Sequence, residues 1–242
     1  MQFSAAYLSR RCLPVLYFFL LISFSSCLTS RKMDKWIDRQ YGSTVPQKMK
    51  SSDYITIKTD NLTKSEKVST TQKGKRKLIP ALFYWHWDYS TVSTLNPYIP
   101  VSNVSTTIMP YANSKGLRQK LNGQKLELTF DQAPAVFELT EKGNLIFVLV
   151  YYIGWENIYI EPKNEEMVVA YRLLNSNNEE TKKGVITITN RDQPISLKMF
   201  QSPKKMTWRY LEQYNNNIKS MSRELVDKLM LEIVPADNLA KP

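Results

Sequence analysis

Apolar and polar residues alternate with a period of two along most of the chain from about residue 52 onward, a pattern typical of half-buried β-strands. The segments that show it number about eight, and they are 54–57, 78–89, 126–130, 136–139, 145–153, 158–160, 167–174 and 185–189. A basic stretch at 73–77 reads as a loop, and 141–144 reads as a hairpin turn. Because the run 145–153 is continuously apolar, we expect it to be a central strand covered on both faces.

Two stretches follow a helical period instead. Between Pro100 and Gly123 apolar residues sit at helix-like offsets, and Gly123 is placed as a C-cap. After Pro203 the apolar positions step by three and four as far as Ile233, which predicts a closing helix of about 25–30 residues. The pattern therefore predicts an α+β fold, a mainly antiparallel sheet of about eight strands with one early helix and a long C-terminal helix packed on it. A β-sandwich with a C-terminal helix is the alternative.

The N-terminus has the organisation of an export signal. Arg10 and Arg11 form a basic region, residues 12–24 are dominated by Leu, Phe, Ile and Val, and Ser25-Ser26-Cys27 follows directly. A membrane-spanning helix needs roughly 20 apolar residues, so this run is too short to serve comfortably as a permanent anchor.

The end of that segment resembles a bacterial lipobox, the signal read by the lipoprotein signal peptidase. The small residues Ser25 and Ser26 suit an extended peptide in a protease cleft, and the thiolate of Cys27 is the nucleophile that takes a diacylglyceryl group. The resemblance implies that Cys27 is the lipidated first residue of a mature lipoprotein. Leu28, with no Asp beside the lipidated residue, implies the outer membrane of the cell envelope. A generic secretory signal with an incidental Cys is the alternative.

Charge divides the chain into regions. Residues 28–77 hold 13 Lys/Arg against 5 Asp/Glu, whereas residues 78–242 hold 18 against 17. We therefore expect a signal peptide at 1–26, a flexible basic tether at 27–51 and a single α+β domain at 52–242. The tether either attracts anionic lipid or is a solvated spacer. Nucleic acid is not an expected partner, because the domain lacks a basic footprint.

The composition removes most site chemistry. With 1 His and 2 Cys in 242 residues, the chain is short of the roughly four Cys or His ligands of a structural zinc site and of the His that catalytic triads use. It also has no glycine-rich phosphate loop. We expect no metal, no cofactor and no enzymatic activity.

The most unusual segment is Tyr84-Trp85-His86-Trp87-Asp88-Tyr89. In a strand, Tyr84, His86 and Asp88 point to one face and the three other side chains to the opposite face. The expectation is that the Trp face is core and the His/Asp face is solvent or sheet edge. The alternative is a sugar- or lipid-binding surface formed by Tyr84, Trp85, His86, Trp87 and Asp88.

The order of elements, with a lipobox, a spacer, strands around an early helix, the strand 167–174 and a long final helix, resembles auxiliary outer-membrane lipoproteins of envelope transport systems. The resemblance implies a non-enzymatic protein, held by membrane lipid through acylated Cys27, that binds a protein partner in an envelope transport or assembly system. A carbohydrate- or lipid-binding lipoprotein that uses Trp85 and Trp87 is the second hypothesis. A periplasmic hydrolase that uses His86 and Asp88 is the third.

Overall fold

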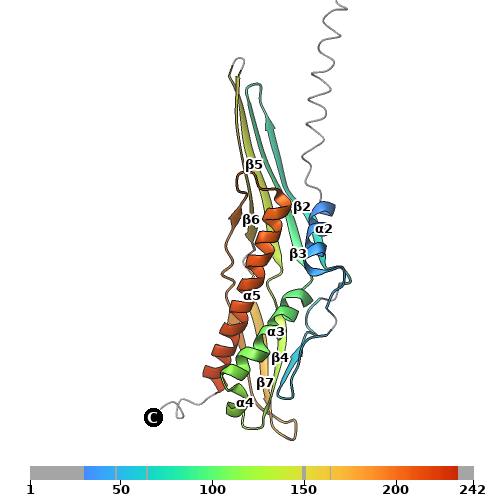
Figure 1. Ribbon diagram of the computed structural model, residues 1–242, viewed down its shortest axis with the longest axis vertical. Coiled ribbons are helices and arrows are strands. Elements are labelled where there is room, and N and C mark those ends of the chain that lie inside the picture. The colour runs from blue at the N-terminus through green and yellow to red at the C-terminus, as the bar shows by residue number, and fades with distance from the viewer. Residues whose placement is uncertain (1–29, 47, 64, 149–150, 164, 234–242) are drawn as a thin grey trace, which may run out of the picture.

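The computed structural model describes residues 30–46, 48–63, 65–148, 151–163 and 165–233 (Figure 1). Its fold is α+β, as expected. The elements in chain order are α2 (Ser30–Tyr41), β1 (Ile55–Lys58), β2 (Ser69–Pro80), β3 (Tyr84–Leu95), α3 (Tyr98–Ser114), α4 (Leu117–Lys120), β4 (Lys125–Gln132), β5 (Val136–Val148), β6 (Tyr151–Pro162), β7 (Met167–Leu174), β8 (Glu180–Ile188), β9 (Ile195–Ser196) and α5 (Pro203–Ile233).

The strands form two sheets rather than the expected single one. The first has the order β1-β4-β7-β8, with β1 parallel to β4 and the other neighbours antiparallel. Along β7 the side chains of Met167, Val169, Tyr171 and Leu173 are buried while their neighbours are more exposed, so this strand has one core face. This sheet forms the body of the molecule together with the helices.

The second sheet has the order β2-β3-β5-β6-β9, and all its neighbours are antiparallel. Four of its strands are 12 or 13 residues long. They form two hairpins, β2-β3 and β5-β6, joined side by side through β3 and β5. The end of β2, the start of β3, the end of β5 and the start of β6 project well beyond the helices as an extension (Figure 1), which we call the arm.

Helix α5 holds the body together. Tyr210 of α5 packs on Phe137 of β5 with ring centroids 5.0 Å apart, and the Tyr214 hydroxyl donates a hydrogen bond of 2.5 Å to the Pro134 carbonyl. Helix α3 lies alongside α5 (Figure 1). With 31 residues, α5 confirms the closing helix that the apolar spacing predicts.

Four predictions were wrong, and all four concern strands of the second sheet. The stretch 78–89 contains the end of β2, a turn at 81–83 and the start of β3 rather than one strand. The basic residues 73–77 belong to β2, and 141–144 lie inside the straight strand β5. The apolar run 145–153 covers the end of β5 and the start of β6, and its described side chains are half-buried or exposed, so it is not a central strand with both faces covered.

The early helix is divided. It forms α3, which continues through Pro110, and the short α4. Gly123 follows α4 with a φ of +81°, in the left-handed region that a helix-ending glycine occupies. The predicted helix and its stop signal are therefore present, with Gly116 (φ +68°) supplying the break between the two segments.

Part of the expected flexible tether is a packed helix. Helix α2 occupies 30–41, and its Met33 and Ile37 are fully buried. Trp36 and Tyr41 extend this stripe at helical spacing. The charged residues between them lower the average hydrophobicity, which is why composition alone indicated a solvated spacer.

The expected signal peptide at 1–26 and the lipidation residue Cys27 lie outside the described residues. Among the helices of the described ranges, none is both long enough and apolar enough to cross a membrane.

Candidate functional site

The arm ends in a concentration of exposed apolar side chains. Fifteen large apolar residues are exposed in the described part of the chain, and eleven of them belong to the two hairpin ends. These eleven, which we call the arm end, are Leu78, Ile79, Leu82, Phe83, Tyr84, Trp85, Val148, Tyr151, Tyr152, Ile153 and Trp155. Leu82 is 83% exposed and Tyr151 is 75% exposed. Because monomeric proteins rarely leave a large contiguous apolar patch in water, the arm end has the character of a binding surface.

One face of the arm is mainly apolar. Strand pairing aligns Leu78 with Trp87 and Trp85 with Leu145, which places these four side chains on the same face. The Trp87 ring lies over Gly143, where an added Cβ would fall 2.0 Å from the ring atom Cζ2. Gly143 is therefore required to make room for the indole.

The opposite face of the arm is polar only toward the body, whereas its end carries the exposed apolar side chains of Ile79, Tyr84, Val148, Tyr151, Ile153 and Trp155. The polar part of this face is internally bonded. Lys75 forms an ion pair with Asp88, and Lys163 with Glu138. The hydrogen bond from Lys75 holds the pKa of Asp88 below its usual value. Asp88 Oδ1 is nevertheless buried without a hydrogen-bond partner among the described residues.

His86 also has a structural partner on this face. The distance from His86 Nδ1 to Asn144 Oδ1 is 2.9 Å, and the same oxygen accepts a hydrogen bond of 2.7 Å from the Tyr84 hydroxyl. No hydrogen bond joins His86 to Asp88 within the described ranges. The geometry therefore does not place Asp88 as an orienting partner of a histidine base, which the hydrolase hypothesis would need.

The structure brings together the five residues of the aromatic segment on strand β3 but corrects which face is covered. Trp85 is 44% exposed and Trp87 is half-buried, so the Trp face is not core. Asp88, expected at solvent or an edge, is 5% exposed, because β3 is an inner strand and Lys75 covers the carboxylate. The alternative interpretation, a lipid- or sugar-binding surface, is consistent with the exposed aromatic side chains of this segment.

The apolar face carries two neighbouring carboxyl groups, Glu141 of β5 and Glu156 of β6. Burial, followed by the charge of Glu156 and a hydrogen bond to it, raises the pKa of Glu141 to about 7. No salt bridge joins either residue to a Lys or Arg among the described residues. The pair is thus an acidic site, without a cation, within an apolar face.

Helix α2 fixes how the N-terminal side of the chain meets the arm. The Thr207 hydroxyl lies 3.7 Å from Met33 Sδ near the start of α5, and Tyr41 bonds to Asn215 further along that helix. The two helices therefore run in the same direction, and α2 begins at the end that faces the arm (Figure 1). Asp34 ties this helix to strand β2 by accepting hydrogen bonds from Ser69 and Thr71.

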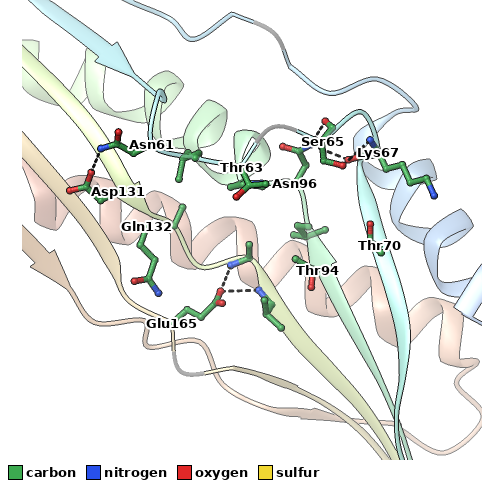
Figure 2. A pocket seen from close by; sticks show the side chains of 16 residues that line it. Asn61, Thr63, Ser65, Lys67, Thr70, Thr94, Asn96, Asp131, Gln132 and Glu165 are labelled. Carbon is green, nitrogen blue, oxygen red and sulfur yellow. Dashed lines mark hydrogen bonds between the residues drawn. The ribbon is translucent and has the colours of Figure 1, made fainter.

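A surface pocket of about 410 Å³ lies in the body, away from the arm end. Figure 2 shows that its polar side chains bond within the protein: Asn61 to Asp131, Asn96 to the Ser65 carbonyl, and Glu165 to the backbone amides of Ala135 and Val136. Because these groups already hold the loops around the pocket, they do not converge on a vacant ligand position.

No group of three His, Cys, Asp or Glu side chains suited to a metal ion occurs in the part of the chain that the structure describes. Comparison with known proteins found no matching family model, curated protein or solved structure. The exposed arm end is therefore the feature from which function has to be argued.

Sequence reasoning missed most of the arm end. It singled out Tyr84 and Trp85 but assigned Leu78 and Ile79 to a half-buried strand and 145–153 to a central strand covered on both faces. The signal that was available is the basic stretch 73–77 directly before an apolar one, because a strand buried on both faces does not carry consecutive cations.

Proposed function

We propose that this chain is a non-enzymatic lipoprotein of the bacterial envelope, held by lipid on Cys27, whose arm inserts its apolar end into the bilayer that carries this lipid. The single observation behind the proposal is the arm end, where most of the exposed large apolar side chains gather. The outer membrane is the proposed location. Among the earlier hypotheses this develops the lipid-binding one, with Trp85 and Trp87 as part of the contact.

Chain geometry supports the use of one bilayer for both contacts. Cys27 precedes Ser30, the first residue of α2, by three residues, which reach at most about 11 Å. Along the helix, Ser30 lies about 6 Å closer to the arm end than Asp34 does. Asp34 accepts a hydrogen bond from the Thr71 hydroxyl. From Thr71 to Pro80, strand β2 rises about 30 Å. The arm therefore extends about 24 Å past the level of Ser30, against about 30 Å for the hydrocarbon core of a bilayer.

The residue types suit lipid. Leu82 and Phe83 occupy the turn of the first hairpin, and burying such side chains in hydrocarbon is favourable by about 1.5–3 kcal/mol each. Tyr and Trp side chains, which are enriched in the arm end, favour positions where one end of the ring is apolar and the other reaches polar groups. A lipidated residue strengthens the attachment, because acyl chains and an inserted apolar segment act as two anchors.

The proposal is tested with the full lipidated protein in vesicles of phosphatidylcholine and phosphatidylglycerol. Because Cys27 is acylated in the mature chain, a single introduced cysteine takes an environment-sensitive fluorophore. The test variant is Leu78→Cys on the apolar face of the arm. The matched control is Val185→Cys, an exposed position of β8 in the other sheet. We expect a blue-shifted emission in vesicles at position 78 and an unchanged emission at position 185.

Two results would overturn the proposal. The first is an emission at position 78 that stays the same with and without vesicles, which would mean that the arm end is covered by a protein partner or remains in water. The second is a free thiol on Cys27 in intact-mass analysis of the protein isolated from membranes.

A further inference from the structure

Both outer edges of the arm are open. Strand β2 is an outermost strand of its sheet, and β9 pairs with β6 only at Tyr159 and Ile160. In the described ranges no strand pairs with the outer side of β2 or with the outer side of β6 before Tyr159. In water such an edge is hydrated, but in hydrocarbon each unpaired backbone group costs several kcal/mol. An arm inserted in lipid, as proposed above, therefore requires a partner strand at each edge.

The directions of the two edge strands fit each other. Strand β2 runs toward the arm end and β6 runs away from it. When two copies stand side by side in the same orientation, β6 of one and β2 of the next are antiparallel, the arrangement already present throughout this sheet. The contact is between different edges, so every copy offers one edge to each neighbour.

The charges of the two edges are complementary. The cations of β2 are Lys73, Lys75, Arg76 and Lys77, whereas β6 holds Glu156 and Glu161 and no cation. Of the four cations only Lys75 has a salt-bridge partner among the described residues. Like charges opposed across strands are destabilising and opposite charges are favourable, so these edges disfavour pairing of β2 with β2 and favour pairing of β2 with β6.

The sheet register places the matching charges on the same face. Leu78, Trp87, Gly143 and Glu156 align across the four strands, and Arg76 lies two residues from Leu78 along β2. Arg76 and Glu156 therefore share the apolar face. On a neighbouring copy, Arg76 is within reach of the Glu141–Glu156 pair and supplies the cation that this pair lacks within its own chain.

We infer that the partner of each arm edge is a second copy of this chain, with β6 of one copy hydrogen-bonded to β2 of the next and Arg76 of that copy paired with Glu156. The inference rests on the proposed insertion of the arm, because the edges need a partner strand only if the arm lies in lipid. The pairing itself is carried by strand direction and charge.

Cysteine cross-linking tests this pairing in membranes of cells that express two differently tagged full-length chains. One carries Lys77→Cys and the other Asn157→Cys, two positions that align across the arm on the face opposite Trp87. Within one copy they are separated by β3 and β5, about 14 Å at roughly 4.8 Å per strand, beyond the 7 Å that a disulfide allows. A disulfide between the two tags therefore reports contact between copies.

Face and register are controlled separately. The chain with Lys77→Cys is also paired with Trp155→Cys and Tyr159→Cys, which cover a stagger of two residues on the same face. Ile158→Cys is the matched control, because a shift of one residue turns the side chain to the opposite face. We expect a disulfide with one of 155, 157 and 159 that is at least about fivefold stronger than with 158.

Charge reversal gives a second, independent readout. Arg76→Glu in both chains is expected to lower the yield of the cross-link about fivefold, the effect of roughly 1 kcal/mol across one cross-strand pair. Adding Glu156→Arg is expected to restore it. Arg39→Glu, on the exposed side of α2, is the control that leaves the yield unchanged.

The inference is overturned if Lys77→Cys chains cross-link to each other as well as to the second tag, or if position 158 reacts as strongly as 155, 157 and 159. It is also overturned if none of these pairs reacts. If no pair reacts but the fluorophore at position 78 still reports lipid, the proposed insertion of the arm is supported and only the pairing between copies is rejected. Cross-linking without a lipid signal at position 78 leaves the pairing and removes the proposed insertion.

Discussion

At the scale of single residues, the contact of Trp87 with Gly143 shows how the arm accommodates a large ring on an exposed sheet. The indole occupies the space in which any other residue at position 143 would place its Cβ. The ring thereby covers the backbone of the adjacent strand, so that a cross-strand aromatic side chain shields the glycine. Gly154 of β6 differs, because an added Cβ would come closest to the end of the Leu145 side chain, at 3.0 Å, and would be in ordinary contact with the Asn144 carbonyl oxygen at 3.5 Å.

Replacing Gly143 by Ala is therefore expected to displace Trp87 and to lower the free energy of unfolding by about 1–3 kcal/mol. Gly154→Ala, the matched control, is expected to change it by less than about 0.5 kcal/mol. Urea denaturation followed by tryptophan fluorescence measures both. Equal midpoints for the two variants would mean that Trp87 does not occupy this position.

Glu141 makes stability depend on pH. Its pKa is raised from the usual 4.5 to about 7 by burial and by Glu156. Between these two values the folded chain binds more protons than the unfolded one, so the free energy of unfolding falls as pH rises. The contribution of Glu141 is fully present below about pH 4.5 and is lost as the pH passes 7.

The melting temperature of the protein in detergent is accordingly expected to fall between pH 5.5 and pH 8. Glu141→Gln removes this titration, so we expect its melting temperature to fall by about 2–4 °C less than that of the parent over the same pH range. This difference is equivalent to about 1 kcal/mol in a domain of this size. Glu212→Gln, at an exposed position of α5, should behave as the parent protein does. Parallel curves for the parent and Glu141→Gln would show that the two carboxyl groups do not share an apolar site.

At the scale of elements, helix α2 determines, in the proposed account, where the lipid anchor meets the arm. Met33 and Ile37 are completely buried, and Asp34 holds β2 through the hydroxyls of Ser69 and Thr71. The Trp208 indole adds a hydrogen bond of 3.0 Å to the Trp36 carbonyl. The helix is thus part of the body, and in the proposed account it sets the anchor close to the base of the arm.

Ile37→Ala is expected to lower the free energy of unfolding by about 2–5 kcal/mol, the cost of a cavity at a buried isoleucine. Lys35→Ala, two residues away on the exposed side of the helix, serves as the control and should have little effect. Both are measured by urea denaturation. If Ile37→Ala unfolds at the same urea concentration as the parent, α2 is not docked on the body.

How much could be predicted from the sequence differs between the body and the arm. Helix α5 and strands β4 and β7 have regular apolar periods because they have one core face, and these were predicted. Residues 145–153 have the composition of a buried strand, but the described side chains among them are half-buried or exposed, so composition indicated core where this part of the chain has none. The turns could not be located, because 81–83 is as apolar as its flanks.

At the scale of the whole molecule, the body and the arm have separate tasks. The body carries the continuous hydrophobic core and helix α2, while the arm extends from it and carries exposed apolar side chains at its end. In the proposed account the acyl chains on Cys27 and the arm end attach the protein to one membrane. Two weak attachments to the same surface reinforce each other, so the loss of one is only partly disabling.

Removing each attachment separately tests this division. Cys27→Ser is expected to shift part of the protein from the membrane fraction to the soluble fraction. Cys27→Ser combined with Leu82→Asp and Phe83→Asp is expected to release nearly all of it, because charged side chains at the turn oppose insertion. The control combines Cys27→Ser with Val185→Asp and Leu231→Asp, exposed apolar positions outside the arm. If the control releases as much protein into the soluble fraction as the arm variant does, the arm end does not attach the protein to the membrane.

The most direct measurement is the quenching of a fluorophore along strand β2 by lipids brominated on their acyl chains. Single cysteines at positions 73, 78 and 185 of the lipidated protein are labelled and compared in the same vesicles. The account predicts strong quenching at 78, weak quenching at 73, which lies near the level of the anchor, and none at 185. Equal quenching at 78 and 185 would contradict it.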